Sequence, residues 1–111
     1  MSKNTVGLTI LEQLGGRQFI LMTGASHLGT TGNNLFFKLP GRPGFVRDSI
    51  NHVDILLTPA DTYTITFSRV RGMKIKTVKQ HEDIYAEDLR QIFRDTTGLE
   101  TRMPQFRRSA A

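Results

Sequence analysis

The sequence predicts an α+β domain in which an antiparallel sheet of about five strands is flanked by an N-terminal and a C-terminal helix. Apolar residues recur at helical spacing near both ends of the chain, and short strand-like runs separated by turn residues fill the middle. The length of 111 residues suits one domain with one modest core. We expect residues 1–99 to form this domain and residues 100–111 to form a basic, flexible C-terminal tail.

The first helix is expected over residues 5–14. Val6, Ile10 and Leu14 follow one another at intervals of four residues, which places them on one helical face. Gly15 and Gly16 come directly afterwards, and glycine favours the left-handed backbone that ends a helix.

Two strands are expected next, over residues 19–22 and 35–39, because each is a short apolar run bounded by turn residues. The segment between them, residues 24–34, is rich in Gly, Thr, Ser and Asn and is predicted to be a long turn. Residues 40–50 contain two prolines and two glycines, which predicts a loop.

Three further strands are expected over residues 53–57, 62–68 and 73–79. Residues 62–68 alternate large side chains with hydroxyls, which predicts one core face and one solvated face. Thr58-Pro59-Ala60-Asp61 has the composition of a turn, and Gly72 separates the last two strands as a hairpin.

The last helix is expected to begin at the acidic pairs of residues 82–83 and 87–88, since carboxylates complement the positive end of a helix dipole. Its apolar face would carry Tyr85, Leu89, Ile92 and Phe93. Gly98 followed by apolar Leu99 indicates a helix C-cap with its hydrophobic contact.

The composition excludes several classes of protein. The chain has no cysteine, which excludes disulfides, thiolate metal sites and a cysteine nucleophile. Its longest apolar runs are far shorter than the roughly 20 residues of a membrane span, and its first residues do not resemble a secretion signal. We therefore expect a soluble cytoplasmic protein that does not contact a membrane.

One segment, Thr23-Gly24-Ala25-Ser26-His27-Leu28-Gly29, resembles the glycine-rich nicotinamide-binding turn of short-chain dehydrogenases. That turn needs a following helix to meet the pyrophosphate, whereas here more turn residues and a strand are expected. The same glycines approximate a P-loop, but its lysine is missing. We expect no cofactor.

The titratable residues do not predict catalysis either. His27, His52 and His81 lack metal-ligand spacing, and the acidic neighbours of His81 suit a solvated turn. No serine has a base partner visible in the sequence. The paired carboxylates suit the start of a helix better than acid–base chemistry, which requires a burial that shifts the pKa. The sequence therefore predicts neither an enzyme nor a metal site.

Positive charge is the feature that points to a function. The net charge is +5, and residues 69–80 contain five basic residues and no acidic one. Lys74 and Lys76 are expected to face solvent, on the side of their strand opposite Ile75. On a hairpin such cations could contact nucleic-acid phosphates, with hydroxyls of the neighbouring strand beside them. The candidate nucleic-acid-binding residues are Arg69, Arg71, Lys74, Lys76 and Lys79, together with Arg42 and Arg47 in the loop and Arg107 and Arg108 in the tail.

The positive charge also suits roles that do not involve nucleic acid. Lysines on an exposed edge strand protect a sheet from aggregation, and a basic surface can bind an acidic protein partner. Few aromatic residues are free to stack on bases, namely Phe36 or Phe37, Phe45 and Phe106. The sequence also leaves open whether the chain forms homo-oligomers.

Three stretches together resemble a family of small, largely uncharacterised proteins encoded by bacteriophages and other mobile elements. They are residues 9–25 (TILEQLGG to MTGA), residues 57–63 (LTPADTY) and residues 83–99 (DIYAEDL to TGL). The resemblance implies the cytoplasm of a bacterial host and two alternative functions. One is a non-catalytic accessory protein that binds nucleic acid, such as single-stranded DNA; the other is a protein-interaction factor such as an inhibitor of a host defence system, including anti-CRISPR activity.

Overall fold

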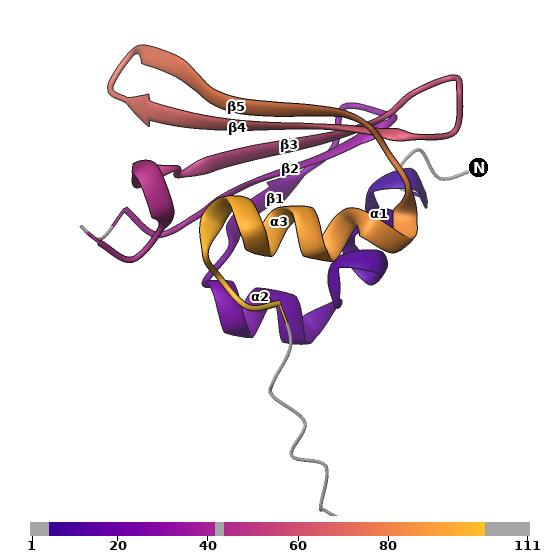
Figure 1. The fold of residues 1–111 in the computed structure, drawn as a ribbon, viewed down its shortest axis with the longest axis horizontal. Coiled ribbons are helices and arrows are strands. Elements are labelled where there is room, and N and C mark those ends of the chain that lie inside the picture. Colours follow the sequence, from indigo (N-terminus) through magenta and orange to yellow (C-terminus); the bar gives the residue numbers. More distant parts are fainter. Residues whose placement is uncertain (1–4, 42–43, 102–111) are drawn as a thin grey trace, which may run out of the picture.

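The computed structural model describes residues 5–41 and 44–101, and these residues confirm the predicted α+β class. Five strands form one antiparallel sheet, and three α-helices accompany it (Figure 1). In chain order the elements are α1 (Thr5–Leu14), α2 (Arg17–Thr23), β1 (Ser26–Gly29), β2 (Asn34–Lys38), the 3₁₀ helix η1 (Arg47–Ser49), β3 (His52–Leu57), β4 (Tyr63–Arg71), β5 (Lys74–Ile84), the 3₁₀ helix η2 (Ala86–Asp88) and α3 (Leu89–Thr97).

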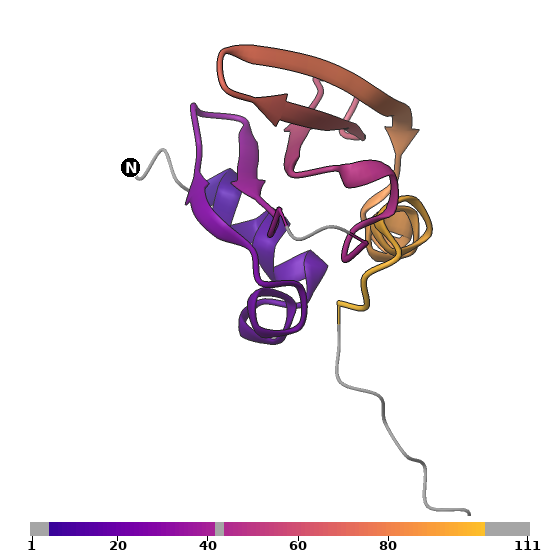
Figure 2. The ribbon, with the colours of Figure 1, turned by 90° about the vertical axis from the view of Figure 1, so that its left-hand side faces the viewer.

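The sheet is a meander in which every strand pairs with its neighbour in the chain, in the order β1-β2-β3-β4-β5. All three α-helices lie on one face of this sheet (Figure 1), and the sheet is strongly twisted (Figure 2). Within the described residues, no helix has the length and apolar character needed to cross a membrane.

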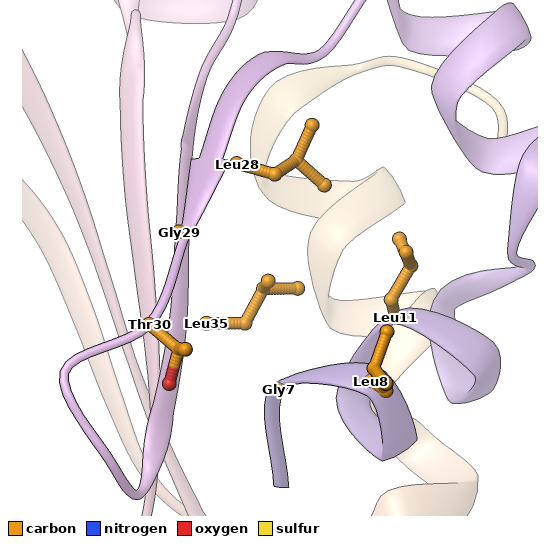
Figure 3. Close-up of a pocket in the computed structure, with 7 residues that line it drawn as sticks. All are labelled: Gly7, Leu8, Leu11, Leu28, Gly29, Thr30 and Leu35. Atoms are coloured by element: carbon orange, nitrogen blue, oxygen red, sulfur yellow. The ribbon is translucent and has the colours of Figure 1, made fainter. Parts of the chain in front are cut away.

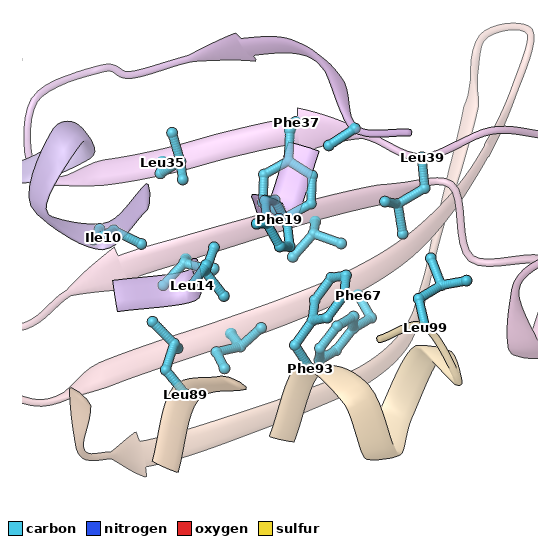
Figure 4. Close-up of a cluster of buried hydrophobic side chains, with 14 of the residues drawn as sticks. Ile10, Leu14, Phe19, Leu35, Phe37, Leu39, Phe67, Leu89, Phe93 and Leu99 are labelled. Atoms are coloured by element: carbon cyan, nitrogen blue, oxygen red, sulfur yellow. The ribbon is translucent and has the colours of Figure 1, made fainter. Parts of the chain in front are cut away.

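The core lies between the sheet and the helices, where four phenylalanines meet (Figure 4). The ring of Phe19 on α2 packs edge-on against Phe37 of β2 and Phe93 of α3, with ring centroids 5.2 Å apart in both pairs. Phe67 of β4 packs against Phe93 from the sheet side. All four side chains are fully buried, so α2, α3 and the middle of the sheet share one hydrophobic core.

The N-terminal helix is confirmed at residues 5–14, but the strand expected at residues 19–22 is wrong because this segment forms α2. Phe19 and Thr23 are buried while Leu21 is 75% exposed, a helical rather than an alternating pattern. Gly24 ends the helix in the left-handed region with φ 73°, and its N–H donates to the carbonyl of Ile20. An apolar run of four residues is too short for periodicity to separate a strand from a helix.

The segment predicted to be a long turn contains an additional strand, β1. It pairs with β2 at two positions, Ser26 with Lys38 and Gly29 with Phe36, with an irregularity between them. The strands predicted in the middle of the chain are confirmed as β2, β3, β4 and β5, and the turn at Thr58 is confirmed by its bond from Asp61 N to Thr58 O. The predicted loop over residues 40–50 includes η1.

The last helix begins later than predicted. Strand β5 continues to Ile84, and α3 begins at Leu89. Asp83 adopts a positive φ of 58° where the register between β4 and β5 shifts, so the strand absorbs an irregularity and keeps pairing. Tyr85 precedes the helix and is 60% exposed, which makes its predicted place on the apolar face wrong.

The C-terminal end of α3 agrees with the prediction. Leu89 and Phe93 are buried, Ile92 packs against the core, and Gly98 forms the expected left-handed C-cap. Glu100 and Thr101, the first two residues of the predicted tail, are part of the fold, since Thr101 is buried and accepts a hydrogen bond from Arg90 Nε at 3.1 Å.

Candidate nucleic-acid interface

The outer half of the β4–β5 hairpin, residues 69–79, extends past the rest of the sheet (Figure 1), and we call it the distal hairpin. Strand β3 pairs with β4 only as far as the pair His52–Ser68. Beyond Val70, β4 and β5 pair only with each other. Gly72 has a positive φ of 59° at the first position of the two-residue turn, where glycine is favoured. Every residue from Arg71 to Thr77 is exposed.

Two pairs of like charges stand opposite each other on this hairpin. Arg69 pairs with Lys76 and Arg71 pairs with Lys74 in the register of β4 and β5. Cross-strand partners share a face, and residues two apart on a strand do so as well, so all four cations lie on the same face. Like charges placed directly opposite each other destabilise a sheet. The arrangement is therefore unfavourable for the isolated chain.

A bulge brings Lys79 to the same face. Phe67 pairs with Lys79 and Ser68 pairs with Thr77, so Val78 is an extra residue on β5. In a regular strand Lys79 would have pointed away from Lys74 and Lys76. Because Lys79 is an odd number of residues away from Lys74 and Lys76, the sequence predicts that it lies on the other face and gives no sign of the bulge. We call Arg69, Arg71, Lys74, Lys76 and Lys79 together the cationic face.

The opposite side of the distal hairpin is apolar and also exposed. Val70 pairs with Ile75, whose side chain is 73% exposed, and Met73 at the turn is 99% exposed. Lys74 and Lys76 are exposed as predicted, but the Ile75 side of the strand faces solvent as well. The tip of the hairpin extends past the α-helices (Figure 1), and from Arg71 to Thr77 neither face covers the core.

The hydroxyls of β4 do not lie beside these cations, so that part of the prediction is wrong. Ser68 pairs with Thr77 and Thr66 pairs with Gln80, which places them on the face opposite the cationic face. Thr66 Oγ1 accepts a hydrogen bond from Gln80 Nε2, and Ser68 is 5% exposed. Thr62 is buried and its hydroxyl lies 3.0 Å from that of Thr58. The cationic face must act through its ammonium and guanidinium groups alone.

The base of the distal hairpin is held in place by two side chains. Asn51 makes two hydrogen bonds to the backbone of Val70, donating from Nδ2 to the carbonyl at 2.9 Å and accepting from the amide at 2.7 Å. Arg69 Nη2 donates to the carbonyl of Asp48 in η1 at 2.6 Å. Asn51 was not among the predicted functional residues, and only its position before a strand could have suggested a role.

Arg47 serves the fold rather than the cationic face. Its Nη1 donates to the carbonyl of Asp95 at 2.7 Å, and its guanidinium lies beside Gly98 at the C-terminal end of α3. A cation at this position interacts favourably with the negative end of the helix dipole. Arg42, Arg107 and Arg108, the other predicted cations, lie outside the described residues, as does Phe106.

The cationic face has no carboxylate partner within residues 5–41 and 44–101. None of its five residues forms an ion pair there, whereas Arg94 lies near both Asp95 and Glu100. An open hollow of about 470 Å³ lies beside it, lined by Arg69, Arg71, Lys74, Ile75 and Lys76. The four exposed cations, Arg71, Lys74, Lys76 and Lys79, are thus available to an anion from outside the chain.

The predicted stacking residues that the structure describes lie away from the cationic face. Phe37 is buried in the core, while Phe36 is partly exposed and stacks on His52 with centroids 6.3 Å apart. The pairing of Phe36 with Asp54 and of Asp54 with Thr66 places this stack on the sheet face opposite the cationic face. Phe45, 36% exposed, is in the loop before η1.

A second hollow, of about 420 Å³, lies between α1 and the strands β1 and β2 (Figure 3). Leucine side chains from both sides point into it, and no titratable residue lines it.

The segment that resembles a nicotinamide-binding turn runs from the end of α2 into β1, so no helix follows its glycines. His81, predicted in a solvated turn, lies in β5 with its ring edge-on to Phe67, and its Nε2 is 3.3 Å from Thr96 Oγ1.

The side chains that could ligate a metal are dispersed over the fold. Across the described ranges, no group of three or more His, Asp or Glu side chains comes together in a way that could hold a metal ion.

Comparison of the chain with protein-family models, curated proteins and solved structures yields no match. The similarity to proteins of phages and mobile elements therefore stays a prediction.

Proposed function

We propose that this chain binds nucleic acid without catalysis, through phosphate contacts made by the cationic face of the distal hairpin. The observation that carries the proposal is the pair of like-charged cross-strand neighbours, Arg69 with Lys76 and Arg71 with Lys74. A polyanion would turn this repulsion into attraction, because each phosphate could lie between two cations.

The amount of charge suits a phosphate backbone. Four of the cations, Arg71, Lys74, Lys76 and Lys79, are exposed and make no ion pair within the described part of the chain. If all four contact phosphates of a duplex, the binding constant should fall roughly 100-fold between about 50 and about 200 mM salt. Protection of a sheet edge by lysines does not require the cations of two paired strands to stand opposite each other.

The test is a binding titration with labelled single-stranded and duplex oligonucleotides at these two salt concentrations. Substitution of Lys74→Glu with Lys76→Glu lowers the net charge from +5 to +1 and should weaken binding at least roughly 100-fold. The matched control, Arg17→Glu with Lys38→Glu, makes the same charge change at exposed positions on α2 and β2 and should weaken binding only a few-fold.

Two outcomes contradict the proposal. Absence of binding by the unmodified protein at low salt, to single strands and to duplexes, rejects it outright. Equal loss of binding in both double variants would mean that net charge, and not the distal hairpin, attracts the oligonucleotide. In the first case, capture of one acidic bacterial protein by the cationic face would support the protein-interaction function instead.

A further inference from the structure

The distal hairpin has the shape and chemistry of a ribbon that enters a groove of duplex DNA. Building on the proposed function, we infer that the nucleic acid is duplex DNA and that Met73, at the tip of the distal hairpin, inserts between base pairs and bends the duplex. The shape of the hairpin, the position of its apolar side chains and the support at its base all favour this mode of binding.

The distal hairpin lacks stacking residues where its cations lie. Residues 69–79 contain no aromatic side chain and no histidine. Proteins that bind single strands combine a cationic groove with aromatic rings on which successive bases stack. The Phe36–His52 stack is on the opposite face of the sheet, so one strand could not run along the cationic face and stack there at the same time.

The shape of the distal hairpin suits a groove. Beyond Val70 it is a two-stranded ribbon without a third strand or a helix against it (Figures 1 and 2). Two-stranded ribbons enter the major or the minor groove of B-form DNA, whereas the major groove of an RNA duplex is too narrow for side chains. A free ribbon is therefore suited to DNA, with the cations of β4 and β5 against the phosphates beside the groove.

The tip of the distal hairpin is apolar and exposed. Met73 is 99% exposed and Ile75 73% exposed, although both lie among basic residues. Proteins that bend DNA from its minor groove insert apolar wedges such as Met and Ile between base pairs, and the unstacking is compensated by additional phosphate contacts. Met73 stands at the turn, between Arg71 and Lys74, so phosphates flanking an opened base step would lie next to both cations.

The base of the distal hairpin is supported from two sides. A wedge can hold a bend only if the ribbon that carries it does not yield. The two hydrogen bonds between Asn51 and Val70 connect this base to the residue before β3, and the bond from Arg69 to Asp48 connects it to η1. The tip is therefore exposed to solvent, whereas hydrogen bonds fix the orientation of the base.

The experiment uses the full chain with a DNA duplex roughly two helical turns long, labelled at both ends for energy transfer, and with the corresponding single strand. The unmodified protein should bind the duplex at least roughly tenfold more tightly than the single strand and should increase energy transfer at saturation. Met73→Ala should still saturate the duplex but leave energy transfer at the value of free DNA.

The matched control is Leu21→Ala, which truncates another exposed apolar side chain, on α2, and should bind and bend like the unmodified protein. Asn51→Ala keeps every cation but loosens the base, so it should reduce bending more than binding. Equal or tighter binding of the single strand, or full bending by Met73→Ala, overturns the inference while leaving the proposed function intact. Absence of binding to either oligonucleotide would instead reject the proposed function.

Discussion

In both halves of the β4–β5 hairpin the two strands pair with each other, but the inner half is buried on one face and the outer half is exposed. In the inner half, Tyr63, Ile65 and Phe67 face the helices and are buried in the core. In the outer half, Arg69 and Arg71 have the same orientation, but no α-helix lies against this part of β4 (Figure 1), and Arg69 donates to the carbonyl of Asp48 in η1. The same strand thus serves stability at one end and presents charge at the other, which predicts that substitutions in the two halves have separable effects.

The largest expected effect is in the core that packs against the inner half, at Phe93 of α3. Phe93→Ala removes a fully buried ring that contacts Phe19, Phe37 and Phe67. We expect the free energy of unfolding to fall by about 3–5 kcal/mol, measured by denaturant titration. Met73→Ala, in the outer half, should change it by less than about 0.5 kcal/mol. A similar loss in both variants would show that the tip is packed after all.

An intermediate effect is expected where the two halves meet. Asn51→Ala removes both side-chain hydrogen bonds to Val70 and should lower the free energy of unfolding by about 1–3 kcal/mol. Faster amide hydrogen exchange should appear in residues 69–79 and not in the inner half. Asn33→Ala, at an exposed loop asparagine, is the control and should leave both measurements unchanged.

A gain of stability is expected on the cationic face. Lys74→Glu places a carboxylate opposite Arg71, so a repulsive pair becomes an attractive one. The free energy of unfolding should rise by roughly 0.2–1 kcal/mol, while nucleic-acid binding weakens. Lys74→Gln separates the two contributions, because it removes the repulsion without adding attraction. A loss of stability in both variants would contradict the repulsion on which the proposed function depends.

In the inner half, an effect is also expected at alkaline pH. Burial raises the pKa of the Tyr63 phenol above its usual value of 10.0, and the charge of Asp61 adds to the rise. Above pH 10 the unfolded chain therefore loses this proton before the folded chain does, so stability that is intact below pH 10 falls as the pH rises.

Tyr63→Phe should remove this part of the pH dependence. It should also cost about 1 kcal/mol at neutral pH, since the bond from Tyr63 Oη to Gln13 Oε1 at 2.7 Å is lost. The measurement is the free energy of unfolding at several pH values on both sides of pH 10. Parallel curves for the two proteins would show that Tyr63 has the same pKa folded and unfolded.

Much of the fold could be predicted from local patterns. The spacing of Val6, Ile10 and Leu14 predicted α1, and the alternation of residues 62–68 predicted the buried side of β4. The prediction failed where a short apolar segment is compatible with both a strand and a helix. Residues 19–22 are apolar throughout, and in the folded chain they form a helix whose Phe19 packs against Phe37 and Phe93.

The basic cluster of residues 69–80 was visible in the sequence as composition, because charge needs no folding to be counted. Its arrangement was not visible. The bulge at Val78 and the register of β4 with β5 decide which cations share a face, and they depend on hydrogen bonds between strands. The same register separates these cations from the hydroxyls of Thr66 and Ser68, and tertiary contacts commit Arg47 to the end of α3. The amino-acid sequence by itself determined the α+β class and the amount of positive charge, whereas only the tertiary structure decided which face presents it.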